Sequence, residues 1–213
     1  QIFSDIICPW CYIGTRLLWK AIAELSQNHR ATEFRFKWRP YMIAPGVGEK
    51  GEAMRDFMQK RYGKALNRDK DLSEAALEAG VSLEGGLLSR QMWNSAAAHR
   101  LVQLAGEQQE QQGQPDLQTA MMEALFEAYF HREQNIAALA CLQDLADKVG
   151  VSCEGLSTGS VAALAATYKE PAEARGVKGV PFFCISRQGY PGSFRFSGAQ
   201  FPQTFVRAFQ SLL

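Results

Sequence analysis

Two cysteines near the start of the chain have the type and spacing that most clearly indicate chemistry. Cys8 and Cys11 enclose Pro9 and Trp10 in the order Cys-Pro-Trp-Cys. Across one helical turn, this spacing brings the second sulfur close enough to form a disulfide with the first. At a helix N-terminus, unpaired N–H groups and the positive end of the helix dipole favour a thiolate over a thiol. We therefore predict that Cys8, at the exposed end, attacks, and that Cys11 resolves the mixed disulfide.

The same spacing also occurs in zinc sites, which need two further ligands at a matching spacing. Cys141, Cys153 and Cys184 are isolated from one another, and the three histidines form no pair of that kind. A strand precedes the motif and a helix follows it, which is the context of a redox pair and not of a zinc site. We therefore expect no metal. A purely structural disulfide is a third alternative, although disulfides closing two-residue loops are usually reducible.

The segments around the motif predict a β-α-β unit. Residues 1–7 form a short apolar run of strand type. Residues 12–25 carry apolar side chains at intervals of three and four, which is typical of a helix, and Pro9 suits its first turn. Within residues 33–43, apolar side chains alternate with basic ones over positions 34–39, which predicts a strand with one buried face. The cysteines therefore lie where the first strand gives way to the helix.

The middle of the chain has helical periodicity and almost no strand pattern, and strand character returns near the end. Expected helices span residues 53–62, 72–79, 89–105, 117–130, 136–149 and 160–174, the last kinked or ended early by Pro171. Expected strands span residues 179–185 and 193–196, and a closing helix spans residues 201–213.

The two ends of the chain together predict an α/β fold, in which a small sheet has helices on both faces. A helical segment is inserted in the chain between these two ends. We place the discontinuous outer domain at residues 1–47 and 160–213 and the helical insertion domain at residues 48–159.

Composition narrows the classes of partner. The chain has 213 residues, with 23 Lys and Arg against 22 Asp and Glu and a net charge of +1. This balance argues against a nucleic-acid partner, because phosphate neutralisation needs a cluster of basic residues. No apolar run approaches the roughly 20 residues that span a bilayer. Five cysteines, an odd number, do not form the disulfide framework of a small secreted protein. We therefore expect a cytoplasmic protein, and leave open a leader upstream of Gln1.

Six short motifs resemble, in this order, those of a known family. They are CPWCYIG at 8–14, WRPY at 38–41, AHRL at 98–101, EAYF at 127–130, GVPFF at 179–183 and SGAQ at 197–200. The series resembles the DsbA-like thioredoxin family, in the branch of FrnE-type oxidoreductases named from polyketide biosynthesis, over essentially the whole chain. The resemblance implies a thioredoxin-like fold with a large all-helical insertion. Relatives of the family include 2-hydroxychromene-2-carboxylate isomerases and kappa-class glutathione transferases, which act with glutathione.

The resemblance also implies roles for single residues. Cys8 matches the nucleophilic cysteine and Cys11 the resolving one. Pro181 matches the family's cis-proline, which packs beside the two cysteines, whereas its position alone predicts only the start of a strand. Val180 then supplies the backbone N–H and C=O groups that pair with a bound peptide or with the cysteinyl part of glutathione.

Four further positions have weaker expected roles. Pro9 and Trp10 would tune the redox potential and cover the site. Ser197 and Gln200, just before the last helix, would lie where backbone N–H groups can bind a carboxylate. Between them the chain has Gly198-Ala199 where the glutathione-using relatives tend to carry Ser-Asp. This departure argues against a tight glutathione site.

The remaining candidates have plainer interpretations. His99 lies on a helix expected to line the cleft, where it could assist proton transfer or simply be a packed or capping histidine. Cys141 and Cys184 are expected to be small buried hydrophobic residues, and Cys153 an exposed thiol without function.

Three hypotheses for the function follow. The first is a thiol-disulfide oxidoreductase acting through a mixed disulfide on protein or small-molecule substrates. It requires no cofactor, although glutathione is a candidate co-substrate. The second is a glutathione-dependent isomerase or transferase, in which Cys8 is the thiol site and Cys11 is dispensable. The third is a chaperone-like binding module that uses the cleft around Trp10. A homodimer is one assembly that we leave open.

Overall fold

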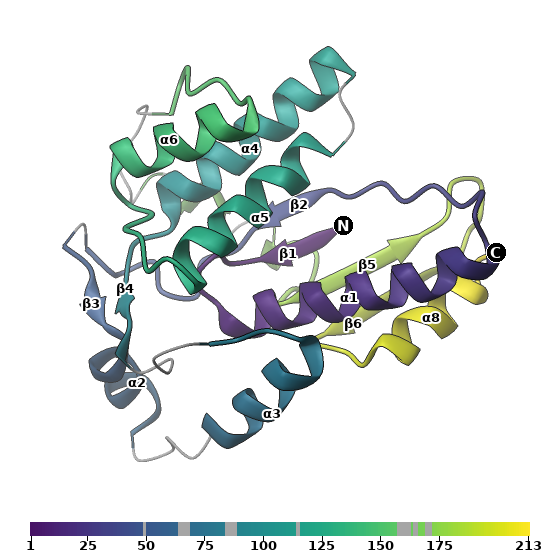
Figure 1. The fold of residues 1–213 in the computed structure, drawn as a ribbon, viewed down its shortest axis with the longest axis horizontal. Helices are drawn as coiled ribbons and strands as arrows, with labels where there is room; N and C mark the ends of the chain where they lie inside the picture. Colours follow the sequence, from purple (N-terminus) through teal and green to yellow (C-terminus); the bar gives the residue numbers. More distant parts are fainter. Residues whose placement is uncertain are drawn as a thin grey trace.

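Four strands form the central sheet of the computed structural model (Figure 1). They are β1 (Ile2–Ser4), β2 (Trp38–Pro40), β5 (Phe182–Ser186) and β6 (Ser193–Ser197), in the spatial order β2-β1-β5-β6. β1 runs parallel to β2 and antiparallel to β5, and β5 and β6 form an antiparallel hairpin. The sheet is therefore mixed, and the strand that leads to Cys8 is an inner strand. The structure describes residues 1–48, 50–63, 69–83, 89–113, 116–156, 163, 166–168 and 172–213.

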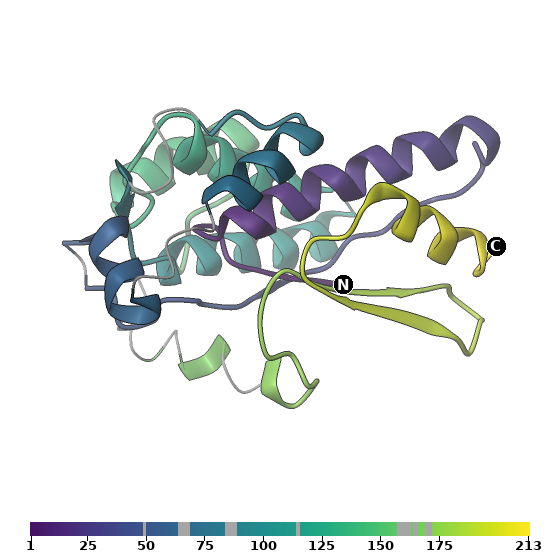
Figure 2. The same cartoon turned by 90° about the horizontal axis from the view of Figure 1, so that it is seen from below.

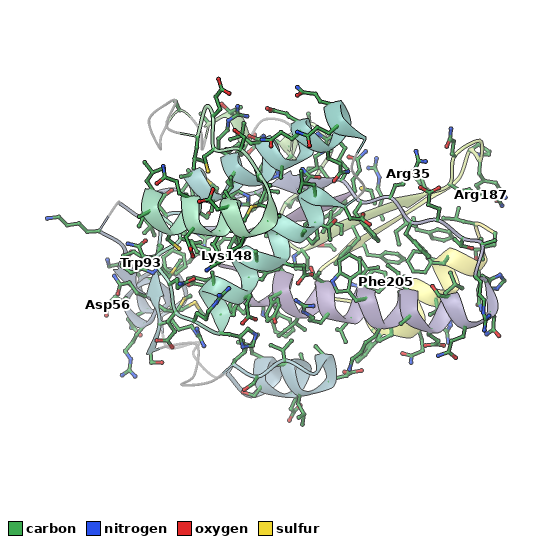
Figure 3. All side chains as sticks on the ribbon, turned by 45° about the horizontal axis from the view of Figure 1, so that its top comes forward. Arg35, Asp56, Trp93, Lys148, Arg187 and Phe205 are labelled. Atoms are coloured by element: carbon green, nitrogen blue, oxygen red, sulfur yellow. The ribbon has the colours of Figure 1, made fainter. Side chains whose placement is uncertain are left out.

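Helices α1 (Pro9–Asn28) and α8 (Pro202–Gln210) lie side by side on one face of the β5–β6 hairpin (Figure 2). Phe205 points from α8 into the layer between helices and sheet (Figure 3). Its ring meets that of Phe183 edge-on, with the centroids 5.0 Å apart. On the other face of the sheet, Ala172 and Val177 pack against Phe3. The sheet is thus covered on both faces at β1, whereas Ser193, Arg195 and Ser197 of β6 are exposed on the second face.

The polypeptide between the two halves of the sheet is mostly helical. It contains β3 (Glu52–Ala53), α2 (Met54–Tyr62), α3 (Asp69–Ala79), β4 (Gln91–Met92), α4 (Ala96–Gln112), α5 (Leu117–Phe130) and α6 (Leu139–Val149). Helices α4, α5 and α6 pack against one another, whereas α3 packs against α1 (Figure 1). Within the described residues, no helix is both long and apolar enough to cross a membrane.

Two predicted elements differ from the structure, and a third lies mostly outside the described residues. The strand expected over residues 33–43 is limited to β2, because β1 forms its ladder only with Trp38–Pro40. Residues 91–92 form β4, which pairs antiparallel with β3, where the start of a helix was expected. The expected helix over residues 160–174 lies mostly outside the described residues.

One hydrophobic core extends across the sheet, α1 and the inserted helices. Tyr12 of α1 stacks on Phe130 of α5, with ring centroids 5.0 Å apart and nearly parallel planes. Arg16 pairs with Glu123, which also accepts a hydrogen bond from the Trp19 indole at 2.7 Å. The inserted helices are therefore packed onto the helix that follows the cysteine motif. The division into 1–47 with 160–213 and 48–159 stays a prediction.

Candidate active site

The cysteine motif lies at the junction of β1 and α1, as the sequence predicts. Cys8 is the residue before the helix and has an extended backbone, and Pro9 occupies the first helical turn. The Cys8 N–H donates to the Asp5 carbonyl at 3.1 Å, which closes the turn between strand and helix. The Cys11 N–H in turn donates to the Cys8 carbonyl at 3.0 Å. The helix thus begins at the motif and aligns its first N–H groups toward this end.

The two sulfurs lie in different surroundings. Cys11 is fully buried, and the Asp5 N–H donates to its sulfur at 3.4 Å. Burial, followed by the hydrogen bond to Cys8 and by its charge, raises the pKa of the Cys11 thiol well above its ordinary value. Cys11 is therefore held as a thiol. Cys8 is only 5% exposed, but it lines a cavity that Cys11 does not reach.

The Val180–Pro181 peptide bond is cis and lies beside the motif. The Cys8 sulfur is 3.9 Å from the Val180 carbonyl oxygen. A Cβ atom at Gly14 would lie 3.1 Å from Pro181 Cγ and 3.3 Å from the ring of Phe183. Glycine at position 14 therefore permits the close approach of α1 to the cis-proline, which brings two segments about 170 residues apart in sequence to one site.

Cys8 opens onto a cavity of about 1050 Å³. One wall is formed by Pro9 and Trp10, and a second by residues 176–180, which include Val180. A third wall comes from α2, with Met54, Phe57 and Met58. Charged side chains in the lining are Arg61, Glu173 and Lys178. The cavity is thus mainly apolar, and both the outer part of the fold and the insertion contribute to it.

Ser197 and Gln200 are not brought into this cavity. Among the described residues that line it, neither is present. Gln200 instead donates from Nε2 to the Ser197 carbonyl at 3.0 Å and to the Gly198 carbonyl at 3.2 Å. The Gly198 N–H donates to the Pro181 carbonyl at 2.8 Å. This turn therefore braces the segment behind the cis-proline, and its expected role in binding a carboxylate stays a prediction.

The three other cysteines are each partly exposed and unpaired. We predicted that Cys141 and Cys184 are buried, and both are more exposed than that prediction. Burial, with the charge of a nearby aspartate second, raises the pKa of both Cys141 and Cys153. In the part of the chain that the structure describes, no group of three or more His, Cys, Asp and Glu side chains is arranged to hold a metal ion.

A buried pair beneath the motif includes a residue that the sequence analysis missed. Asp5 is fully buried, and its Oδ1 lies 3.2 Å from Nε2 of His99, which is 2% exposed. The carboxylate also accepts hydrogen bonds from the Ile43 N–H at 2.7 Å and the Ile7 N–H at 3.4 Å. The signal for Asp5 was an acidic residue inside an apolar strand run, three positions before Cys8. His99 therefore faces Asp5 inside the core, in the packed position that the sequence analysis weighed against a role in proton transfer at the cleft.

The comparison with protein families agrees with this geometry. A family model described as a DSBA-like thioredoxin domain matches residues 1–210. The chain belongs to this family. The DSBA-like fold accounts for the mixed sheet and for the helical insertion. A comparison with the curated proteins found no match.

Solved structures with the same fold include oxidoreductases and an isomerase. The probable DsbA oxidoreductase of Streptomyces coelicolor is 24% identical over 99% of this chain and 88% of its own, with a TM-score of 0.77. The cytosolic disulfide reductase DsbM of Pseudomonas aeruginosa is 18% identical over 99% and 96%, with a TM-score of 0.61. A 2-hydroxychromene-2-carboxylate isomerase is 17% identical over 99% and 94%, with a TM-score of 0.62. At these identities the likeness shows the fold, and with the family it supports an enzyme in the general sense.

Proposed function

We propose that the protein is a thiol-disulfide oxidoreductase that uses Cys8 as the nucleophile and Cys11 as the resolving thiol. The observation that carries this proposal is the different placement of the two sulfurs. Cys8 lines the cavity at the start of α1, 3.9 Å from the Val180 carbonyl oxygen, whereas Cys11 is fully buried behind it. A substrate can therefore reach the first sulfur while the second stays out of its reach.

The reaction proceeds through two exchanges of a sulfur–sulfur bond. In the reducing direction, the Cys8 thiolate attacks one sulfur of a substrate disulfide, and the electron pair of the broken bond leaves on the other substrate sulfur. Cys11 then loses its proton and attacks Cys8, so that the Cys8–Cys11 disulfide forms and the remaining substrate sulfur leaves as a thiolate. Two electrons pass from the protein to the substrate. Oxidation of a dithiol is the reverse sequence, and the redox potential sets the direction.

The wall at Val180 supports main-chain recognition of the substrate. An extended substrate segment that pairs with the Val180 N–H and C=O groups would present its sulfur to Cys8, and this mode tolerates many sequences. Pro9 and Trp10 also line the cavity and would cover the sulfur during the exchange. This arrangement suits a protein or small-molecule thiol, and it requires no cofactor.

Glutathione is the co-substrate that we propose. A solved structure of DsbM with GSH is 18% identical to this chain, with a TM-score of 0.60. Arg61 and Lys178 in the cavity lining carry the charge that would attract its carboxylates. The same cations favour a glutathione-dependent isomerase or transferase as the second candidate. The buried Cys11, placed against Cys8, favours the oxidoreductase.

The deciding experiment is an equilibrium titration of the protein in glutathione redox buffers, with Cys8→Ser and Cys11→Ser alongside. We expect one two-electron transition that requires both cysteines, and its midpoint gives the direction. If no Cys8–Cys11 disulfide forms and catalysis with glutathione survives Cys11→Ser, the isomerase or transferase replaces this proposal. The third outcome is that the protein shows no thiol-disulfide exchange and the variant with both substitutions still binds an unfolded client protein. The chaperone-like binding module would then replace this proposal.

We place this activity in the cytoplasm. The isolated cysteines outside the motif support a reducing compartment, and the similar fold of a cytosolic disulfide reductase agrees with it. Substrates are then protein or small-molecule disulfides of that compartment. A homodimer stays a prediction.

A further inference from the structure

Two arginines lie together on the face of the sheet opposite α1 and α8. Arg39 of β2 is the register partner of Phe3, so its side chain projects from the same face as the Phe3 ring. The guanidinium carbon of Arg175 lies 6.0 Å from the centre of that ring. Neither arginine is among the described residues that line the cavity of Cys8. The proposed exchange reaction therefore uses neither of them.

The two guanidinium groups meet at one neutral oxygen. Arg39 donates from Nε to Gln1 Oε1 at 3.4 Å, and Arg175 donates from Nη1 to the same oxygen at 3.2 Å. An amide oxygen carries no formal charge, and these distances are long for N–H···O hydrogen bonds. Burial, followed by the charge of Arg175, lowers the pKa of Arg39. Both arginines stay protonated, so two like charges are held close together around a weak acceptor.

No carboxylate compensates these two charges in the part of the chain that the structure describes. Neither Arg39 nor Arg175 forms an ion pair there. The nearby carboxylate of Glu110 accepts a hydrogen bond from Lys37 at 2.9 Å and only senses the charge of Arg39 from farther away. Lys37 is therefore already paired, and the positive charge of the two arginines remains without an anionic partner.

The backbone holds both arginines in place. Arg39 belongs to the ladder between β2 and β1. Arg175 lies in a turn in which its own N–H donates to the Ala172 carbonyl at 3.1 Å and the Val177 N–H donates to the same carbonyl at 3.0 Å. The side chains of Ala172 and Val177 fix this turn on the sheet by packing against Phe3. A ligand that binds both guanidinium groups would therefore find the two backbone positions already arranged.

We propose that Arg39 and Arg175 bind a phosphate group, with one phosphate oxygen in the place that Gln1 Oε1 now occupies. A charged oxygen would accept both hydrogen bonds at about 2.7–2.9 Å and would make each of them roughly twice as strong. Phosphate with two negative charges neutralises both arginines, whereas a single carboxylate leaves one positive charge. Gln1 is exposed, so its side chain can turn into solvent. The inference does not depend on the proposed redox function.

The extent of the cluster fits one phosphate and not a nucleic-acid backbone. Arg195 is also exposed on this face, but it belongs to β6. β5 lies between β6 and β1, which places Arg195 about 10 Å away from β1 across the sheet. A chain of phosphates would need a continuous row of cations. The ligand is therefore a phosphate group that is free or carried by a small molecule.

The test is calorimetric titration of the full chain with inorganic phosphate at pH 8, at an ionic strength held constant with sodium chloride. We expect one saturable site, and we expect Arg39→Gln and Arg175→Gln each to weaken binding at least about tenfold. The matched control is Arg207→Gln. It removes the same charge from the exposed side of α8, on the opposite face of the sheet, so the affinity should not change.

Further ligands identify what the site recognises. Sulfate, which also carries two charges, should bind, and acetate should bind at least about tenfold more weakly than phosphate. Ribose 5-phosphate separates the two sources of the group. Equal affinity for it and for inorganic phosphate would show that the phosphate group alone is recognised, and tighter binding would show that its carrier is also contacted. Either result supports the proposal.

Three results would overturn the proposal. They are the absence of saturable binding at millimolar phosphate, equal weakening in Arg207→Gln and the two site variants, and acetate binding as tight as that of phosphate. If the site variants do not fold, the unsubstituted protein still decides. In its ¹H–¹⁵N spectra, phosphate should shift the Nε–H signals of Arg39 and Arg175 and leave that of Arg207 in place. Unshifted signals of Arg39 and Arg175 would also overturn the proposal.

Discussion

On the cavity side of the Cys8–Cys11 turn, the walls are mainly apolar and include methionine side chains from α2. On the buried side, beneath Cys11, lie a carboxylate, an imidazole and their hydrogen-bond partners. Methionine is flexible and adapts to partners of different shape, whereas a buried polar network requires a fixed geometry. The comparison indicates that the cavity side of this helical turn is built to adapt, whereas the buried side holds the turn in one geometry.

The largest expected effect is a difference in alkylation between the two cysteines. We expect iodoacetamide to modify Cys8 at least about 100-fold faster than Cys11 in the reduced, folded protein, because the thiolate is the reactive form and Cys11 is held as a buried thiol. Peptide mapping by mass spectrometry over time measures both rates. Full unfolding in denaturant is the control, in which the two rates should become similar. Comparable alkylation rates of Cys8 and Cys11 in the folded protein would contradict the distinction between the cavity side and the buried side.

The next effect is a loss of stability at alkaline pH. Burial raises the pKa of the Cys11 thiol in the folded protein well above its ordinary value of 9.0, so the folded state keeps a proton that the unfolded chain releases. Stability from this group is therefore complete below that value and is lost as pH rises above it. The slope is at most about 1.4 kcal/mol per pH unit for one proton.

Urea unfolding of the reduced protein at pH 8 and pH 10 measures this loss, and Cys11→Ser is the matched variant. Tyr129, whose pKa burial also raises, contributes to both proteins, so the difference between them isolates Cys11. An equal loss in the two proteins would show that the buried side does not hold this proton.

The smallest effect concerns the cavity side. Met58 lines the cavity from α2 and is separated in sequence from Asp5 and His99 on the buried side. Met58→Ala removes apolar surface that a substrate side chain would contact, so we expect KM for disulfide peptides with apolar flanking residues to rise, by about tenfold at most. KM for oxidised glutathione and the redox potential of the Cys8–Cys11 pair should not change. A shift of that potential would show that the two sides are coupled.

The fold and the redox motif were largely predictable from the sequence because their signals are local. The strand-to-helix junction at Cys8, the periodicity of α1 and the alternation around Phe196 each depend on residues within one or two turns of chain. The cis state of the Val180–Pro181 bond came from the family resemblance and not from its local sequence.

Pairings between distant residues were not predictable in the same way. The contact of Asp5 with His99 depends on how α4 packs against the loop after β1, which no local pattern records. The β3–β4 pair has two residues in each strand, too few to show a period. Phe34 and Phe36 do alternate, and their rings stack with centroids 6.4 Å apart, but alternation reports the faces of a segment and not whether a neighbouring strand pairs with it.

The stacking of Tyr12 on Phe130 has a consequence for how such a protein can be re-engineered. Tyr12 directly follows Cys11, and its hydroxyl is also 2.8 Å from Nε2 of His131 at the end of α5. Because of this contact, α5 cannot be exchanged for the helix of a relative without shifting the turn that carries the sulfurs. α2 contributes cavity wall and packs chiefly with β3. New substrate preferences are therefore most readily grafted through α2, which can diverge while the helices that support the redox turn are kept.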